Sequence, residues 1–292
     1  MLNNLPGKMI ELNGVEYFVR DSSTGKESVL LLHGWPDDGN LWKHQIIALL
    51  EHDYRVICPD LLGYGLSGTP TDISRYQFTH LVNDMITLLD KLAVEKIHCI
   101  AHDYGAVIGW ELAAHTERLQ TLTAMSVGHL TEFCKTSLEH LQFQWIYFLN
   151  SHDVAPQLYR VKNGYLLREV LGSHPYREEI LKNTLKPGVL ENMQRLEKAN
   201  PVPNYLLAAL AGELPEPVPI KVPTLGIWSN QDDVLWESQM QNSEKYISAE
   251  WQYEKIVDAG HWFMLEQPQQ INQLLLNWLK KHSYSLKIEA RD

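Results

Sequence analysis

Short, mostly apolar runs recur along the first half of the chain. VLLL at 29–32, VIC at 56–58 and IHCIA at 97–101 show no regular alternation of polar and apolar positions. Such runs are typical of strands that are buried on both faces, as in a parallel sheet. Leucines and a methionine recur at spacings of three and four over 81–92, which predicts an amphipathic helix. Strands alternate with helices in this way up to residue 127, and this order predicts right-handed βαβ crossovers.

The pattern changes near the start of the chain and again after the first half. Residues 9–20 read as two short strands joined at an Asn-Gly pair, a strong hairpin signal. Residues 129–216 show helical spacing and many aromatics, but no convincing strand. Strand-like runs return at 223–228 and 251–256, and apolar residues at helical spacing over 271–278 predict a closing helix.

The sequence therefore predicts an α/β fold with an inserted helical unit. We expect residues 1–128 to form the first part of the core, 129–216 a helical cap, and 217–292 the second part of the core. A chain of 292 residues is long enough for one large α/β domain with such an insertion.

Composition narrows the class of protein. Apolar residues make up 45% of the chain, which is enough to bury a full core. The net charge of −11 argues against nucleic acid and anionic membrane surfaces as partners, because both attract basic patches. From the three cysteines we expect no disulfide framework, and from the apolar runs of the sequence we expect neither a signal peptide nor a membrane span. We expect a soluble cytoplasmic protein.

One predicted turn carries a candidate nucleophile. AHDYGA at 101–106 joins an apolar strand-like run to a stretch with helical character. This order matches a nucleophile elbow, a turn so tight that the central residue is strained and its neighbours must be small. Two alanines and a glycine surround Asp103, whose carboxylate would lie at the positive end of the following helix. The alternative is that Asp103 is only a helix N-cap.

Four loops that follow predicted strands carry polar groups. They are HGWP at 33–36, AHDYGA at 101–106, NQDD at 230–233 and AGH at 259–261. Reactive groups in open α/β sheets collect at the carboxyl ends of the strands. Each loop alone is weak evidence, since a lone histidine is more often structural. Together they follow the chain order nucleophile, acid, histidine of the α/β-hydrolase triad, which favours catalysis over an N-cap.

On these motifs the chain resembles the α/β-hydrolase superfamily over nearly its whole length. The aspartate at the elbow is typical of the branch of epoxide hydrolases and haloalkane dehalogenases. The resemblance implies a mostly parallel sheet flanked by helices, with a helical cap. It also implies that Asp103 is the nucleophile, His261 the general base and Asp232 the acid that orients His261. Asp232 lies four residues after Trp228, as in the family, while Asp233 stays open as an alternative.

The resemblance extends to an oxyanion hole. HGWP at 33–36 looks like the family's oxyanion loop, so the backbone N–H groups of Trp35 and Tyr104 would form the hole. A carboxylate suits displacement at an sp³ carbon, which gives an alkyl-enzyme ester. Water activated by His261 would attack the ester, and the hole would stabilise that tetrahedral step. This chemistry requires neither a metal nor an organic cofactor, and we expect no metal site.

Residues of the predicted cap distinguish epoxide hydrolases from haloalkane dehalogenases. Epoxide opening requires a proton donor for the leaving oxygen, and epoxide hydrolases use two cap tyrosines. Tyr205 matches the position of the second, although Leu206 follows it where the family has arginine. Trp145 matches the first position and Tyr147 is the alternative donor, because an indole N–H is a poor proton donor. The aromatics near 145 could also be simple pocket wall.

Three functions follow from these observations. The leading hypothesis is an epoxide hydrolase that adds water to a small or medium, mostly apolar epoxide and releases a diol. A haloalkane dehalogenase would use Trp145 or Trp35 as a halide donor, but Trp35 and Tyr104 replace that family's usual Asn and Trp. The third hypothesis is a hydrolase-fold binding protein with an inactive triad. We expect a small-molecule substrate and water as partners, no nucleic acid and no membrane; a homodimer is compatible with the sequence.

Overall fold

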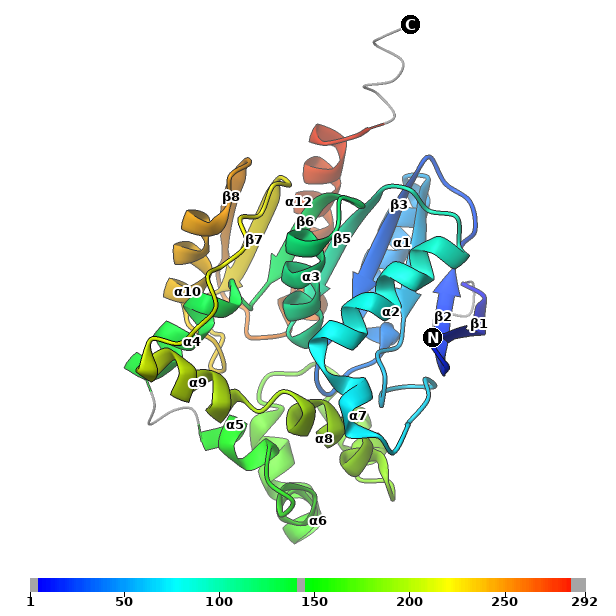
Figure 1. Ribbon diagram of the computed structural model, residues 1–292. Helices are drawn as coiled ribbons and strands as arrows, with labels where there is room; N and C mark the ends of the chain where they lie inside the picture. Colours follow the sequence, from blue (N-terminus) through cyan, green and yellow to red (C-terminus); the bar gives the residue numbers. More distant parts are fainter. Residues whose placement is uncertain (1–4, 141–144, 285–292) are drawn as a thin grey trace, which may run out of the picture.

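An eight-stranded sheet runs through the centre of the computed structural model, which describes residues 5–140 and 145–284 (Figure 1). The strand order is β1-β2-β4-β3-β5-β6-β7-β8. β1 pairs with β2 and β2 with β4 in antiparallel fashion, and the other neighbours are parallel. The strands are β1 (Gly7–Leu12), β2 (Val15–Asp21), β3 (Glu27–Leu32), β4 (Tyr54–Pro59), β5 (Ile97–His102), β6 (Leu119–Met125), β7 (Thr224–Ser229) and β8 (Trp251–Ile256).

The uninterrupted apolar runs correspond to strands covered on both faces. Every residue of β3, β5 and β7 is buried. Alternate side chains of β3 enter opposite layers: Leu30 and Leu32 pack into one buried cluster, whereas Val29 and Leu31 pack into the other. The mostly parallel sheet flanked by helices is therefore confirmed, including the hairpin at its start.

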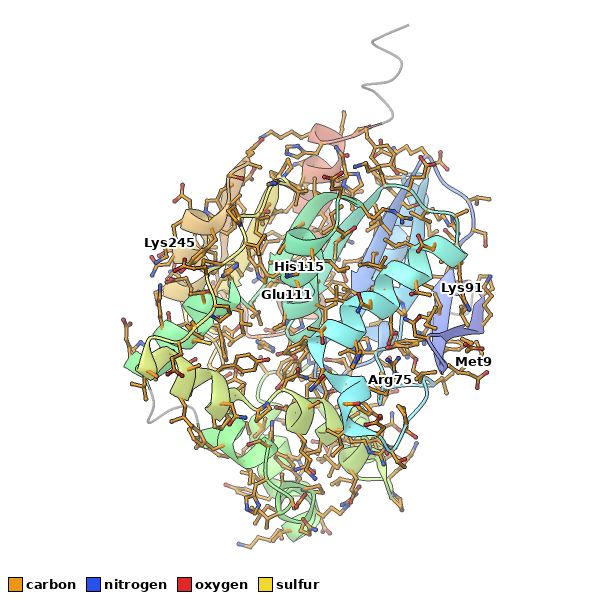
Figure 2. All side chains as sticks on the ribbon, in the orientation of Figure 1. Met9, Arg75, Lys91, Glu111, His115 and Lys245 are labelled. Carbon is orange, nitrogen blue, oxygen red and sulfur yellow. The ribbon has the colours of Figure 1, made fainter. Side chains whose placement is uncertain are left out.

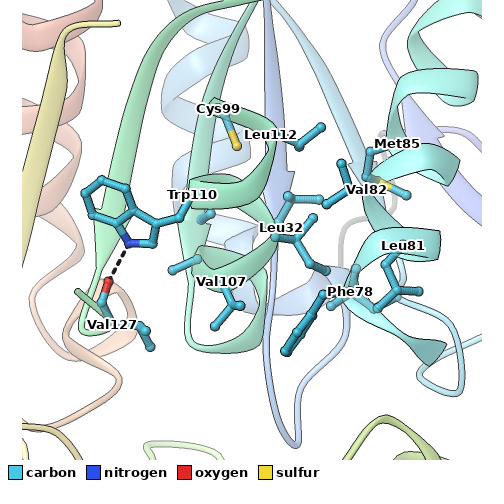
Figure 3. Packing of buried hydrophobic residues seen from close by; sticks show 14 of the residues in the cluster. Leu32, Phe78, Leu81, Val82, Met85, Cys99, Val107, Trp110, Leu112 and Val127 are labelled. Atoms are coloured by element: carbon cyan, nitrogen blue, oxygen red, sulfur yellow. Dashed lines mark hydrogen bonds between the residues drawn. The ribbon is translucent and has the colours of Figure 1, made fainter. Parts of the chain in front are cut away.

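Helices cover the sheet on both faces. α2 (Phe78–Lys91) packs against α3 (Tyr104–His115), and α1 (Lys43–Glu51) packs against α12 (Pro268–Lys281). α3 is fixed on the sheet by apolar contacts that include Val107 and Leu112, and by the Trp110 indole N–H, which donates to the Val127 carbonyl at 3.0 Å (Figure 3). Because α3 is fixed on the sheet, the turn at its N-terminus, which carries Asp103, is fixed as well.

A helical insertion separates β6 from β7, and its helices lie together at one end of the sheet (Figure 1). We call residues 130–211 the helical insertion. No strand occurs among its described residues, as expected, while the predicted domain boundaries at 128 and 216 stay a prediction. Its helices are α4 (Leu130–Glu139), α5 (Trp145–Asn150), α6 (Ala155–Val170), α7 (Arg177–Thr184), α8 (Val189–Ala199) and α9 (Val202–Ala211).

Short elements complete the chain. The 3₁₀ turns at Gly39–Trp42, Ile73–Tyr76 and Asn242–Tyr246, together with α10 (Glu237–Gln241) and α11 (Phe263–Glu266), connect the larger units. In the described part of the chain, none of the helices combines the length and apolarity that crossing a lipid bilayer requires.

Candidate active site

Asp103 occupies the expected strained turn between β5 and α3. Its backbone has φ 53° and ψ −125°, a conformation that is unusual for any residue but glycine. A side chain at Gly105 would place its Cβ 2.3 Å from the Leu32 carbonyl oxygen. A side chain at Gly34 would place its Cβ 2.2 Å from Asp103 Oδ1. Small residues at these positions therefore allow β3 and its loop to approach the turn.

Two backbone amides stabilise the Asp103 carboxylate. The Trp35 N–H donates to Asp103 Oδ1 at 2.7 Å, and the Tyr104 N–H also donates to the carboxylate. The Trp35–Pro36 peptide bond is cis. Oδ1 is therefore occupied, whereas Oδ2 lies toward His261, 3.8 Å from its Nε2.

His261 is oriented by Asp232. Its Nδ1–H donates to Asp232 Oδ2 at 2.9 Å. The other oxygen, Asp232 Oδ1, accepts from the N–H groups of Val234 and Leu235, both at 3.0 Å, so the carboxylate cannot turn freely. Asp233 is exposed and acts on His261 only through its charge. The structure thus brings Asp232 into contact with His261 and leaves Asp233 at the edge of the site.

Charges in this cluster support one another. Burial lowers the pKa of His261, but the charge and hydrogen bond of Asp232, followed by the charge of Asp103, outweigh burial and raise it to about 9. Burial raises the pKa of Asp103, and the charge of His261 and the amides of Tyr104 and Trp35 oppose that rise. An imidazolium at His261 therefore helps to keep Asp103 ionised.

A cavity of about 250 Å³, the main cavity, opens in front of Asp103. The loops after the strands and the helical insertion both contribute to its walls. Apolar and aromatic side chains make most of the lining, and a few polar groups converge on it, as is usual for small-molecule sites. The lining residues are Trp35, Asp103, Tyr104, Trp145, Ile146, Tyr147, Asn150, Glu169, Val170, Glu197, Asp233, Val234, His261 and Trp262.

The predicted donors of the helical insertion fall in two places. Trp145, half exposed, and Tyr147 both line the main cavity with Asp103. Tyr205 instead lines an adjoining cavity of about 30 Å³, which Tyr147 and Asp103 also touch. Burial first, and then the charge of Glu111, raises the pKa of Tyr205. Glu111 lies on α3 (Figure 2), so Tyr205 lies close enough to that helix to interact with the charge of Glu111. Tyr205 is not among the residues that line the main cavity.

Sequence reasoning missed three polar residues of the main cavity, the buried Asn150 and Glu197 and the exposed Glu169. Glu197 is 3% exposed, and its Oε1 accepts from Asn150 Nδ2 at 3.2 Å. A signal was present in the sequence: Leu190, Met193 and Glu197 follow one another at helical spacing, which places an acid on the apolar face of α8.

A further contact ties the helical insertion to the loop of His261. Asp37 accepts from the Trp262 indole N–H at 2.9 Å and from His174 Nε2 at 3.2 Å. Trp262 adjoins His261 and lines the main cavity, so Asp37 positions one wall of the site. Across residues 5–140 and 145–284, no group of three or more His, Cys, Asp or Glu side chains is arranged to hold a metal ion.

Comparison with known proteins shows the family. The family model described as "alpha/beta hydrolase fold" matches residues 27–268. The AB hydrolase superfamily protein YfhM from Bacillus subtilis (strain 168) is 30% identical over 287 residues, which cover 94% of this chain and 97% of that protein. Epoxide hydrolase A from Mycobacterium tuberculosis is 26% identical, over 93% of this chain and 96% of that protein. A solved structure of a mutant epoxide hydrolase from Bacillus megaterium superposes with a TM-score of 0.82 at 24% identity, covering 94% of this chain and 100% of that one. The chain therefore belongs to the α/β-hydrolase fold family.

Proposed function

We propose that the chain is an epoxide hydrolase that acts through an ester on Asp103. The observation that carries the proposal is the placement of the Asp103 carboxylate, with Oδ1 held by the Trp35 amide and Oδ2 facing His261 at the main cavity. A serine elbow would attack carbonyl carbons, whereas a carboxylate suits displacement at sp³ carbon. Relatives named as epoxide hydrolases from several organisms support the choice of substrate.

In the first step Asp103 attacks an epoxide carbon. Oδ2 is the nucleophilic atom, because Oδ1 already accepts a hydrogen bond from the Trp35 amide while Oδ2 faces His261. A new C–O ester bond forms as the ring C–O bond breaks, and the ring oxygen becomes an alkoxide that must be stabilised. The Tyr147 hydroxyl is the best placed of the predicted donors, with the Trp145 indole as the second, since both line the main cavity and Tyr205 does not.

In the second step His261 activates water. Ester formation removes the negative charge of Asp103, which is one of the causes of the raised pKa of His261. The pKa of His261 consequently falls, and neutral His261 can accept a proton from water as that water attacks the ester carbon. The amides of Trp35 and Tyr104 stabilise the resulting oxyanion, and Asp232 stabilises the imidazolium.

A haloalkane dehalogenase is the second candidate function. The observation in its favour is that two tryptophans, Trp35 and Trp145, line the main cavity and could bind a leaving halide through their indole N–H groups. Such an enzyme would share the ester on Asp103 and differ only in the leaving group.

Turnover of a mixed substrate panel tests the proposal. Styrene oxide, cyclohexene oxide and 1,2-epoxyhexane are incubated with the protein beside 1-chlorohexane and 1,2-dibromoethane, and diol and halide are measured. We expect diol from at least one epoxide, and no diol from Asp103→Asn. Halide release without any diol would favour the dehalogenase. Saturable binding without either product, unchanged in Asp103→Asn, would favour a binding protein.

Two further predictions accompany this proposal. A cytoplasmic location is tested by fractionation of the source cells. A homodimer is tested by light scattering of the purified protein.

A further inference from the structure

Glu197 is a buried acid that the mechanism above does not use. It lies in the last turn of α8, is 3% exposed and lines the main cavity together with Asp103 and His261. A carboxyl group in such a place requires an explanation, because Glu is almost never fully buried without a partner.

The partners of Glu197 are neutral. Asn150 Nδ2 donates to its Oε1 at 3.2 Å, and the Tyr104 hydroxyl lies beside the carboxyl group. Asn150 is itself fixed, since its Oδ1 accepts from the Tyr159 hydroxyl at 2.5 Å. Within residues 5–140 and 145–284, no basic side chain contributes to the electrostatic environment of Glu197. The site therefore favours the protonated acid over the carboxylate.

The electrostatics agree with the geometry. Burial first, and then the charge of Asp103, raises the pKa of Glu197 to about 7, although Tyr104 and Asn150 oppose the rise. A group that holds a proton near neutral pH is suited to give it up in a reaction. Because Asn150 donates to Oε1, the proton of Glu197 belongs on Oε2.

Tyr147 is a poorer source of a proton. Burial, followed by the charges of Asp103 and Glu197, raises the pKa of Tyr147 well above its ordinary value. Its hydroxyl can donate a hydrogen bond to the ring oxygen, but losing the proton would leave a phenolate beside two acids. Glu197 loses its proton near neutral pH, so its deprotonation costs less free energy than that of Tyr147.

We propose that Glu197 is the proton donor to the leaving oxygen when Asp103 opens an epoxide. The proposal rests on the proposed function and deepens it. As the ester bond to Asp103 Oδ2 forms, the electron pair of the broken C–O bond stays on the ring oxygen, which takes the proton from Glu197 Oε2 and becomes a hydroxyl. Tyr147 donates a hydrogen bond to the same oxygen.

The proton balance closes over one turnover. Once Asp103 is esterified, the His261 imidazolium passes its proton to the Glu197 carboxylate through water in the main cavity. The attacking water then loses one proton to neutral His261 and places its oxygen on Asp103. Collapse of the tetrahedral intermediate releases the second oxygen of the diol, which takes that proton from His261. Asp103 is then a carboxylic acid, and it returns its remaining proton to His261, which restores the starting ion pair.

The rate of ester formation tests the role of Glu197. In a His261→Gln background the ester cannot be hydrolysed by the usual base, so its formation is followed alone, by rapid quenching and intact mass, with styrene oxide at pH 5 to 9. We expect Glu197→Gln to slow ester formation by about 10²-fold or more at pH 6. With Glu197 present, the rate should fall about tenfold per pH unit above about 7, and Glu197→Gln should remove that fall. The Glu197→Asp variant should form the ester more slowly than the parent, and its rate should still decrease above about pH 7.

Other groups that face Glu197 do not produce the same profile. Asp103 must be ionised to attack, so its titration raises the rate with pH rather than lowering it. Burial raises the pKa values of the neighbouring hydroxyls above their ordinary range, which removes them from this pH window. These hydroxyls belong to Tyr64, Tyr104, Tyr147 and Tyr159.

Glu179→Gln is the matched control. Glu179 also lies in the helical insertion, on α7, but it is exposed and does not line the main cavity, so its replacement should change the rate less than about twofold. Glutamine at 197 can still accept from Asn150, and unchanged circular dichroism would show that the fold is kept. Ester formation by Glu197→Gln within about threefold of the parent, with the same fall above pH 7, would overturn the role of Glu197 and leave the ester mechanism standing. A parent that forms no ester with an epoxide would instead overturn the proposed function, and this inference with it.

Discussion

Replacing Asp232 by asparagine should stop hydrolysis of the ester while sparing its formation. Asp232 Oδ1 accepts from the amides of Val234 and Leu235, both at 3.0 Å. In Asp232→Asn the side-chain oxygen keeps these two contacts, so the new NH₂ group faces His261 Nδ1. That nitrogen must then accept, and the ring proton moves to Nε2. An Nε2–H cannot take a proton from water.

The size of the effect follows from the electrostatics of His261. Its pKa of about 9, against an ordinary value of 6.5, corresponds to about 3 kcal/mol in favour of the imidazolium. Asp232 is the largest cause of the rise, and burial opposes it. Without Asp232 the pKa of His261 should fall, because the largest cause of its rise is gone, and the wrong tautomer adds to the loss. The same replacement in a serine protease triad lowers kcat about 10⁴-fold, and we expect about 10³- to 10⁴-fold here.

Pre-steady-state kinetics measure this loss directly. With an epoxide that the enzyme converts, Asp232→Asn should show a burst of ester on intact mass, followed by diol release slowed to the expected extent. Asp233→Asn is the matched control, because Asp233 is exposed and acts on His261 only through its charge, and it should remain within about tenfold of the wild type. Diol release by Asp232→Asn that stays within tenfold of the wild type would refute the reasoning.

Three further predictions concern the elbow, the buried acid and the donors. Gly34→Ala places a Cβ 2.2 Å from Asp103 Oδ1, so ester formation should fall at least about 10²-fold in a protein that still melts cooperatively. The pKa of Glu197 is raised from 4.5 to about 7, so its contribution to stability is complete below pH 4.5 and is lost as pH rises through 7. In urea unfolding, the wild type should therefore lose about 3 kcal/mol relative to Glu197→Gln between pH 4.5 and 8, and a constant difference would contradict this. Tyr147→Phe should slow ester formation about 10²-fold and Tyr205→Phe less than threefold, and the reverse order in rapid-quench assays would return the donor role to Tyr205.

Local pattern predicted the sheet and the elbow because their physics is local. A strand buried on both faces must be apolar throughout, and β3 and β5 show this directly in their sequences. A turn with a strained central residue must have small neighbours, and the clash that a side chain at Gly105 would cause explains the glycine in AHDYGA. The order of nucleophile, acid and histidine along the chain predicted that Asp103 and His261 meet an acid at the carboxyl ends of the strands, whereas the preference for Asp232 over Asp233 came from the family resemblance.

The walls of the main cavity could not be predicted in the same way. Successive side chains of a helix point in different directions around its axis. The choice between Trp145, Tyr147 and Tyr205 therefore depends on which face each helix of the insertion presents to the main cavity. That face is decided by contacts between distant segments. Glu197 shows the same limit: the sequence places it on the apolar face of α8, but only the packing of α8 makes that face a wall of the cavity.

Mass analysis of a trapped ester tests the central claim most directly. His261→Gln is incubated with an epoxide that the wild type converts to diol, and the intact protein is weighed before peptide mapping. The account predicts a mass increase equal to the whole epoxide, located on Asp103 and absent from the double variant that also carries Asp103→Asn. A folded His261→Gln protein that gains no mass, or gains it at another residue, would contradict nucleophilic attack by Asp103.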